Sequence, residues 1–253
     1  MKLRSAGPVT PLLASVIVAL LTTIPTPSAN GETANATVAK TSTPTPFEAL
    51  YTATYNGSEF EDLVTRKLER LPDGTYKHSY TGDHLLYFLH EESIVDMKGC
   101  NTQPLRYISK RGNFFRKREK TIDFDWKQQI ARFNDEGTKG QFKLEPDTVD
   151  PMSVYLRIAC QVTNEIGTLT FPETDDNHIE KREYRLLGKE TLNTASGSME
   201  TVRIERVHKN KKRQTYIWLM ASNPVVVVRV RQTDTDGSVY SLDLTQWKAV
   251  SAK

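Results

Sequence analysis

Histidines come first among residues that could do chemistry, because imidazole binds metals and transfers protons near neutral pH. The chain contains His78, His84, His90, His178 and His208, with no His-x-His or His-Glu-x-x-His pair among them. His84 and His90 have acidic neighbours in Glu91, Glu92 and Asp96. The spacing of these two histidines is not that of two ligands on one helix or strand. We therefore predict no metal site, and histidines that lie on the surface or in turns.

Motifs for nucleophilic or phosphate chemistry are also missing from the sequence. It contains no Gly-x-Ser-x-Gly segment and no glycine-rich phosphate loop. Asp123 and Asp125 form a carboxylate pair, but acid–base catalysis needs one carboxylate to be desolvated. The alternating Ile122, Phe124 and Trp126 take the opposite strand face, so we expect both aspartates to be solvated. We predict no catalytic residue, no cofactor and no enzymatic activity.

Cys100 and Cys160 are the two cysteines of the chain. In an exported protein they could form a disulfide that closes a loop of about 60 residues. The alternative is a buried free thiol, because Cys160 lies among Ile158, Ala159 and Val162. The sequence leaves both possibilities open.

The charges are nearly balanced, with 34 Lys and Arg against 31 Asp and Glu. A net charge of +3 is too small to indicate a nucleic-acid-binding protein, and we expect no such partner. Two basic runs, residues 116–118 and 209–213, lie at or near predicted hairpin ends. Such residues usually protect sheet edges, and the functional alternative is contact with anionic lipid headgroups or lipopolysaccharide.

The first 46 residues differ in composition from the rest. Lys2 and Arg4 precede an apolar stretch over residues 12–21, and Ala34-Asn35-Ala36 satisfies the small-residue rule of signal peptidase. We predict a signal peptide over residues 1–36 and a Thr/Pro-rich linker over residues 37–46, with an uncleaved anchor as the alternative. Every aromatic residue lies at or after Phe47, so residues 47–253 are predicted to form a single β domain. We expect no transmembrane span after cleavage.

The elements that must position these residues are mostly strands. Apolar and polar residues alternate over residues 47–55, and an Asn56-Gly57 turn follows. Residues 59–70 fit either a helix or the second strand of a hairpin. Further strands are predicted over residues 76–80, 94–97, 104–110 and 116–126. Residues 85–89 are short and apolar enough for one helical turn.

One helix is predicted after Asp150-Pro151, since Asp is a good N-cap and Pro is tolerated at the first helical position. Apolar residues from 152 to 162 cover most of its circumference, which predicts burial on several sides. Two hairpins follow. The first pairs Val202 with Trp218 and Ile204 with Tyr216. The second, around a Thr235-Asp236-Gly237 loop, pairs Val230 with Leu242 and Val228 with Leu244.

Together these elements predict a mainly β fold of about ten strands: a strongly curved antiparallel sheet or partly open β-barrel, with one main helix across its concave face. Several short segments occur in a fixed order: Phe47-Glu48-Ala49, Leu68-Glu69-Arg70, Pro104-Leu105-Arg106-Tyr107, Asp123-Phe124-Asp125-Trp126, Asp150-Pro151-Met152-Ser153-Val154, Glu205-Arg206-Val207, Ile217-Trp218-Leu219 and Asp236-Gly237-Ser238-Val239-Tyr240.

By these segments the chain resembles the domain-of-unknown-function 3108 (DUF3108) family of exported bacterial proteins, over about residues 46–246. It departs from the family at Gly99-Cys100 and at Asn223-Pro224-Val225. The resemblance implies a periplasmic location and an antiparallel sheet wrapped round a helix, as in periplasmic lipoprotein carriers. It also favours a strand over residues 59–70. The family has no established activity, so no catalytic residue follows from it.

The leading functional hypothesis is a non-enzymatic binding or carrier domain for a hydrophobic or lipid-like ligand. The alternatives are an envelope interaction or assembly factor with a filled core, which would have an envelope component as partner, and an enzyme of unrecognised type. The residues expected to line a ligand site could equally form a filled core: Val202, Ile204, Tyr216, Trp218, Val228, Val230, Leu242, Leu244, Met152, Tyr155 and Leu156.

Overall fold

The computed structural model describes residues 44–84, 87–162, 166–223 and 225–250, which all belong to one compact unit over residues 40–253. The predicted signal peptide, residues 1–36, lies outside the described residues, as does the predicted linker up to residue 43. Both remain predictions. No helix within the described ranges is long and apolar enough to span a membrane.

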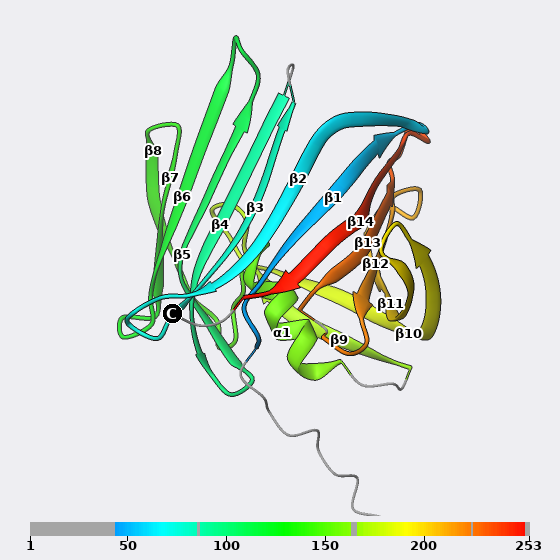
Figure 1. The fold of residues 1–253 in the computed structure, drawn as a ribbon. Helices are drawn as coiled ribbons and strands as arrows, with labels where there is room; N and C mark the ends of the chain where they lie inside the picture. The colour runs from blue at the N-terminus through cyan, green and yellow to red at the C-terminus, as the bar shows by residue number, and fades with distance from the viewer. Residues whose placement is uncertain (1–43, 85–86, 163–165, 224, 251–253) are drawn as a thin grey trace, which may run out of the picture. The chain divides into compact units, whose positions relative to one another are not determined.

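The fold is one large antiparallel sheet with a single short helix in the described part of the chain (Figure 1). The helix is α1 (Ser153–Gln161). The strands are β1 (Phe47–Tyr55), β2 (Ser58–Arg70), β3 (Tyr76–His84), β4 (Tyr87–Lys98), β5 (Asn101–Gly112), β6 (Lys117–Asp125), β7 (Ile130–Asp135), β8 (Thr138–Lys143), β9 (Gly167–Glu173), β10 (Glu180–Thr194), β11 (Gly197–Arg206), β12 (Gln214–Met220), β13 (Val227–Thr233) and β14 (Val239–Ala249).

The strand order is β8-β7-β6-β5-β4-β3-β2-β1-β14-β13-β12-β11-β10-β9, and all neighbours are antiparallel. In the described residues the edge strands β8 and β9 do not pair, so the strongly curved sheet stays open (Figure 1). The mainly β, antiparallel prediction is confirmed, but 14 strands exceed the expected ten. Short strands such as β8 lack a clear alternation of apolar and polar residues.

The local conflict at residues 59–70 is settled by the neighbouring turn. Asn56 and Gly57 both have positive φ, at 49° and 83°, and the turn pairs Tyr55 with Ser58. The segment is strand β2, as predicted from the hairpin interpretation. The helical turn expected over residues 85–89 is wrong from Tyr87 onward, because Tyr87 already begins strand β4; residues 85–86 lie outside the described part. Cross-strand pairing with β3 outweighs the short local pattern there.

The β13–β14 hairpin has the predicted pairing of Val230 with Leu242, and Gly237 occupies its expected left-handed position with φ of 88°. The pairing of Val228 with Leu244 is absent from the described ladder, which ends where Arg229 pairs with Asp243. Val228 instead lies at the irregularity between β12 and β13, where Leu219 pairs with Val227.

The predicted register of the β11–β12 hairpin is wrong by one residue. Val202 lies opposite Leu219, and Ile204 lies opposite Ile217. Strand β12 is apolar on both faces, so matching apolar residues across the hairpin could not distinguish the two registers. The shift places Tyr216 and Trp218 on the opposite face of the sheet from Val202 and Ile204.

Helix α1 packs on the face of the sheet that carries Val202, Ile204 and Ile217, which we call the inner face. The Asp150 carboxylate accepts the backbone N–H of Met152 and of Ser153 at 2.8 Å each, and the Ser93 hydroxyl donates to it at 2.6 Å. Burial raises the pKa of Asp150 to about 6, against the effect of these hydrogen bonds. The helix begins at Ser153 with Met152 at its N-cap position, so the prediction that Asp150 caps it and Pro151 opens it is wrong by two residues. The Asp150 carboxylate still binds backbone N–H groups at the start of the helix.

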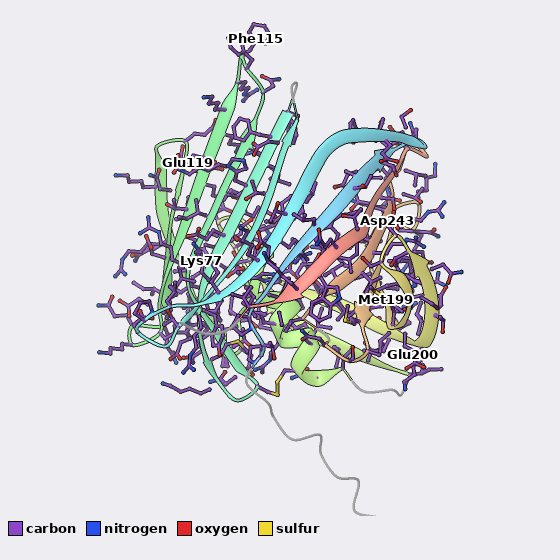
Figure 2. All side chains as sticks on the ribbon, in the orientation of Figure 1. Lys77, Phe115, Glu119, Met199, Glu200 and Asp243 are labelled. Carbon is purple, nitrogen blue, oxygen red and sulfur yellow. A yellow bond between two sulfur atoms is a disulfide. The ribbon has the colours of Figure 1, made fainter. Side chains whose placement is uncertain are left out.

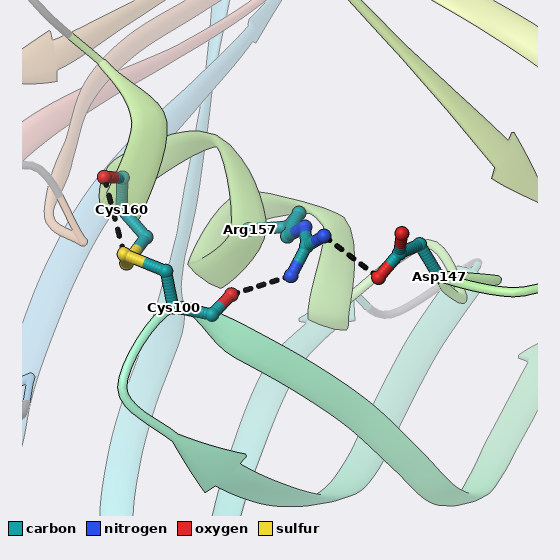
Figure 3. Close-up of a disulfide and its surroundings, with 4 residues drawn as sticks. All are labelled: Cys100, Asp147, Arg157 and Cys160. Carbon is teal, nitrogen blue, oxygen red and sulfur yellow. Dashed lines mark hydrogen bonds and ion pairs between the residues drawn. A yellow bond between two sulfur atoms is a disulfide. The ribbon is translucent and has the colours of Figure 1, made fainter.

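The helix has only nine residues and lies at one end of the curved sheet (Figure 1). Wrapping of the sheet round a main helix is therefore not supported. At its C-terminal end a disulfide joins Cys160 to Cys100 in the turn between β4 and β5, with 5.4 Å between the Cα atoms (Figure 3). Arg157 adds a second tie, donating to the Cys100 carbonyl at 2.5 Å and to Asp147 at 2.8 Å.

Reduction of the disulfide should destabilise the protein substantially, because the bond closes a loop with a sequence separation of 60. The chain-entropy model gives about 4 kcal/mol for a loop of this length. Urea unfolding with and without reductant measures the loss, and Cys100→Ser/Cys160→Ser should behave as the reduced protein does. Free alkylation of both thiols in the native oxidised protein would contradict the bond.

Candidate functional site

A cavity of about 490 Å³ opens on the inner face beside the start of α1. Strands β2 to β6 border it on one side, and β13 and β14 border it on the other. Its lining combines six basic side chains, three acidic ones, four tyrosines and one serine with a few apolar residues: Arg66, Arg111, Arg118, Lys120, Arg206, Arg213, Glu91, Asp175, Asp176, Tyr80, Tyr107, Tyr155, Tyr240, Ser109, Leu89, Pro151, Met152, Val230 and Leu242.

Arg66 is the most deeply buried of the basic residues that line this cavity, with 2% of its surface exposed. It lies on β2 between Val64 and Leu68, and all three side chains point to the buried inner face of that strand. Its Cζ atom lies 4.2 Å from the centroid of the Tyr155 ring, within cation–π distance. Its Nε atom has no hydrogen-bond partner, and no carboxylate in the described part of the chain forms an ion pair with it. A buried cation without a counter-charge is costly, so this guanidinium needs an explanation.

His78 holds Arg66 from the neighbouring strand β3. Its Nδ1 lies 2.9 Å from the Met152 carbonyl oxygen, which can only accept, so Nδ1 carries the proton. Its Nε2 is then free to accept from Arg66 Nη2 at 3.5 Å. Burial and the Arg66 charge lower the pKa of His78 to about 3, so the ring stays neutral. Contrary to the prediction for the histidines, His78 is fully buried.

Tyrosine hydroxyls supply further polar groups to the cavity. The hydroxyls of Tyr80 and Tyr240 lie 3.2 Å apart and join the two sides of the sheet. Tyr107 donates to the Glu91 carboxylate at 2.5 Å. Burial raises the pKa of Glu91, against this hydrogen bond and the charge of Arg66. Glu91 is therefore bound to Tyr107 and does not form an ion pair with Arg66.

The remaining basic residues differ in how far they are neutralised. Lys120 pairs with Asp176 at 3.4 Å, Arg206 with Glu173 at 3.2 Å, Arg213 with Asp234 at 3.2 Å and Arg118 with Asp135. Arg111 has no ion pair to any described carboxylate. Two cations of the cavity, the buried Arg66 and the more exposed Arg111, thus have no ion-pair partner among the described residues.

The structure divides the eleven predicted lining residues into three groups. Met152, Tyr155, Val230 and Leu242 line the cavity. Val202, Ile204, Val228, Leu244 and Leu156 are buried in apolar clusters, two of them packed with Val154 and Ile158 of the helix. Tyr216 and Trp218 line a groove on the outer face. In that groove Arg203 lies over both rings, at 4.4 and 5.3 Å, and Trp218 donates to Glu190 at 3.0 Å.

The residues that sequence reasoning missed carry a signal that alternation could have revealed. Arg66 lies two residues from Val64 and from Leu68, so it shares their face of β2. His78 shares a face of β3 with Tyr76 and Tyr80 in the same way. A charged or titratable residue on a strand face that is otherwise apolar or aromatic marks a polar position in the interior. The predicted exposure of Asp123 agrees with the structure, and Asp125 is partly exposed. No group of His, Cys, Asp or Glu within the described ranges is placed to hold a metal ion.

Comparison with solved structures shows a shared fold at very low identity. The beta-barrel-like protein of domain of unknown function DUF1849 from Brucella abortus has a TM-score of 0.57 and 7% identity, over 82% of this chain and 99% of that one. A Parabacteroides distasonis protein, described provisionally as a lipoprotein, has a TM-score of 0.29 and 10% identity, over 81% of this chain and 96% of that one. The last score is too low to support an argument.

Comparison with curated proteins finds no match. The model of one family, described as "Protein of unknown function (DUF3108)", matches residues 76–245. This range runs from β3 into β14 and includes most of the cavity lining. The resemblance identified from the short segments is confirmed, and the chain belongs to the DUF3108 family.

Proposed function

We propose that this protein is a non-enzymatic binding or carrier protein that holds an anionic amphiphile in the inner-face cavity. One observation carries the proposal: Arg66 is buried, borders the cavity and has no carboxylate partner among the described residues. An anionic headgroup beside it would supply the missing counter-charge and accept from the guanidinium. Such charge-assisted bonds are stronger than those between neutral groups.

The shape and lining of the cavity support an amphiphile of modest size. Leu89, Met152, Val230 and Leu242 offer apolar surface, and the tyrosine rings extend it. The volume of about 490 Å³ lies within the usual range for small-molecule sites. A purely hydrophobic ligand, as first expected from the sequence, would leave the charged lining without a role. We therefore refine the lipid-like ligand to one with an anionic group.

We also propose that the protein acts in the periplasm. The predicted signal peptide over residues 1–36 supports export, and the resemblance to exported bacterial proteins supports this compartment.

The alternatives make different demands on the cavity. An envelope assembly factor with a filled core would need no open inner-face space, and the cavity therefore favours a ligand. An enzyme would need a polar cleft with titratable groups of shifted pKa, and Glu91 fits that description. We favour binding because the Glu91 carboxylate is hydrogen-bonded to Tyr107 and the buried His78 ring is neutral.

Glu91→Gln should then leave ligand binding largely intact.

If Arg66 is kept for binding, its removal should not weaken the fold. We expect Arg66→Met to leave the free energy of unfolding unchanged or to raise it by about 1 kcal/mol, because a buried unpaired charge is replaced by an apolar side chain of similar length. Urea unfolding without ligand measures this. A loss of more than about 2 kcal/mol would make Arg66 a structural residue instead.

Two dyes test the charge requirement directly, because anilinonaphthalene sulfonate and N-phenylnaphthylamine share an aromatic body and differ in the sulfonate. We expect the wild-type protein to bind the anionic dye more tightly. Arg66→Met should lower that affinity about tenfold or more, roughly the loss of one charge-assisted bond, and should spare the neutral dye.

Two control variants accompany this titration. Arg66→Lys keeps the charge and should retain part of the preference, and Arg203→Met removes an aromatic-stacked arginine from the outer face and should change nothing. Equal loss of both dyes in Arg66→Met, or equal affinity of both dyes for the wild type, would count against an anion site.

A further inference from the structure

The hairpin of β5 and β6 ends in an apex that is apolar and exposed. Phe114 and Phe115 have 88% and 92% of their surface exposed, and their rings pack edge to face with centroids 5.4 Å apart. Figure 2 shows Phe115 at the far end of this projecting hairpin. Soluble proteins rarely present two adjacent aromatic rings in this way without a partner.

The apex has a defined backbone. The Asn113 side-chain oxygen accepts the backbone N–H of Phe115 at 2.9 Å and that of Arg116 at 2.8 Å, and Asn113 N donates to the Arg116 carbonyl at 2.8 Å. A Cβ at Gly112 would lie only 2.1 Å from the same carbonyl oxygen, so the tight closure requires glycine. The loop therefore holds both phenylalanines outward.

Positive charge surrounds this apex. Lys110 pairs with Glu119 at 3.2 Å, and Arg118 pairs with Asp135. In contrast, Arg111, Arg116 and Lys117 have no ion pair to any carboxylate that the structure describes. The pairing of Phe88 with Gly112 also brings the start of β4 alongside, where Tyr87 is 49% exposed. The hairpin end thus combines aromatic rings with three cations that lack counter-charges.

We propose that this apex docks on an anionic lipid bilayer. Phe114 and Phe115 enter the boundary between headgroups and acyl chains, while Arg111, Arg116 and Lys117 contact lipid phosphates. Exposed aromatic side chains next to unpaired basic residues are the combination by which peripheral proteins bind such surfaces. A protein partner would need a pocket for two rings lined with acidic groups, whereas a bilayer supplies both properties over its whole surface.

The position of the apex gives the docking a consequence for the cavity. Arg111 and Arg118 pair across β5 and β6 just below the apex, and both line the cavity. A docked molecule would therefore hold Arg111 and Arg118, and with them this side of the cavity, near the lipid surface. That this nearness helps a ligand to enter the cavity rests on the proposed function. The docking itself depends on no cavity ligand, so the two proposals can fail separately.

Vesicle flotation of the purified protein tests the docking. We expect the wild type to float with phosphatidylcholine vesicles that contain phosphatidylglycerol, to float much less with phosphatidylcholine alone, and to dissociate at high salt. Phe114→Ser/Phe115→Ser should reduce the bound fraction at least about tenfold, since two aromatic side chains lose their burial. Arg116→Gln/Lys117→Gln should remove the preference for anionic vesicles.

Matched controls change equivalent residues elsewhere. Ile166→Ser removes an apolar side chain that is 79% exposed, and Lys211→Gln/Lys212→Gln removes two exposed charges from another loop; both should float as the wild type does. Arg66→Met should also float normally. The proposal is overturned if the wild type does not float, if Phe114→Ser/Phe115→Ser floats equally well, or if Arg66→Met alone abolishes flotation.

Discussion

A single curved sheet has one inner face, and a nine-residue helix is too short to cover it. Where α1 packs, Val154 and Ile158 fill the space against Ile204 and Ile217. Beyond the start of the helix the inner face borders the cavity, whose lining is rich in charged and tyrosine side chains. The position of α1 thus decides which part of the interior is core and which part is cavity. Asp150 at one end and the disulfide at the other hold it there.

Within that cavity, the stability of the fold does not explain why an arginine is present at position 66. Tyr155 and His78 hold the guanidinium in place, and the neutral imidazole adds no charge of its own. Glu91, the carboxylate that could neutralise it, is bound to Tyr107. This arrangement keeps a preformed positive group buried away from bulk water, where its attraction for an anion is strengthened.

The sequence revealed the fold better than the site. Alternation located most long strands, and the Asn56-Gly57 turn decided β2 against a local helical pattern. The register of β12 could not be inferred because apolar residues lie on both of its faces, and the misplaced Tyr216 and Trp218 follow from that. The cavity depends on side chains from distant strands that meet only in the folded sheet. Yet the sequence does show Arg66 as a charged residue on the same strand face as Val64 and Leu68.

The central claim is that Arg66 recruits an anion to the inner face. Native mass spectrometry of the protein, purified without detergent from cells that export it, tests this claim most directly when wild type and Arg66→Met are compared. The account predicts a small-molecule adduct on the wild type that is released as an anion and is missing from Arg66→Met. Bare wild-type protein, or the same adduct on both proteins, would contradict it.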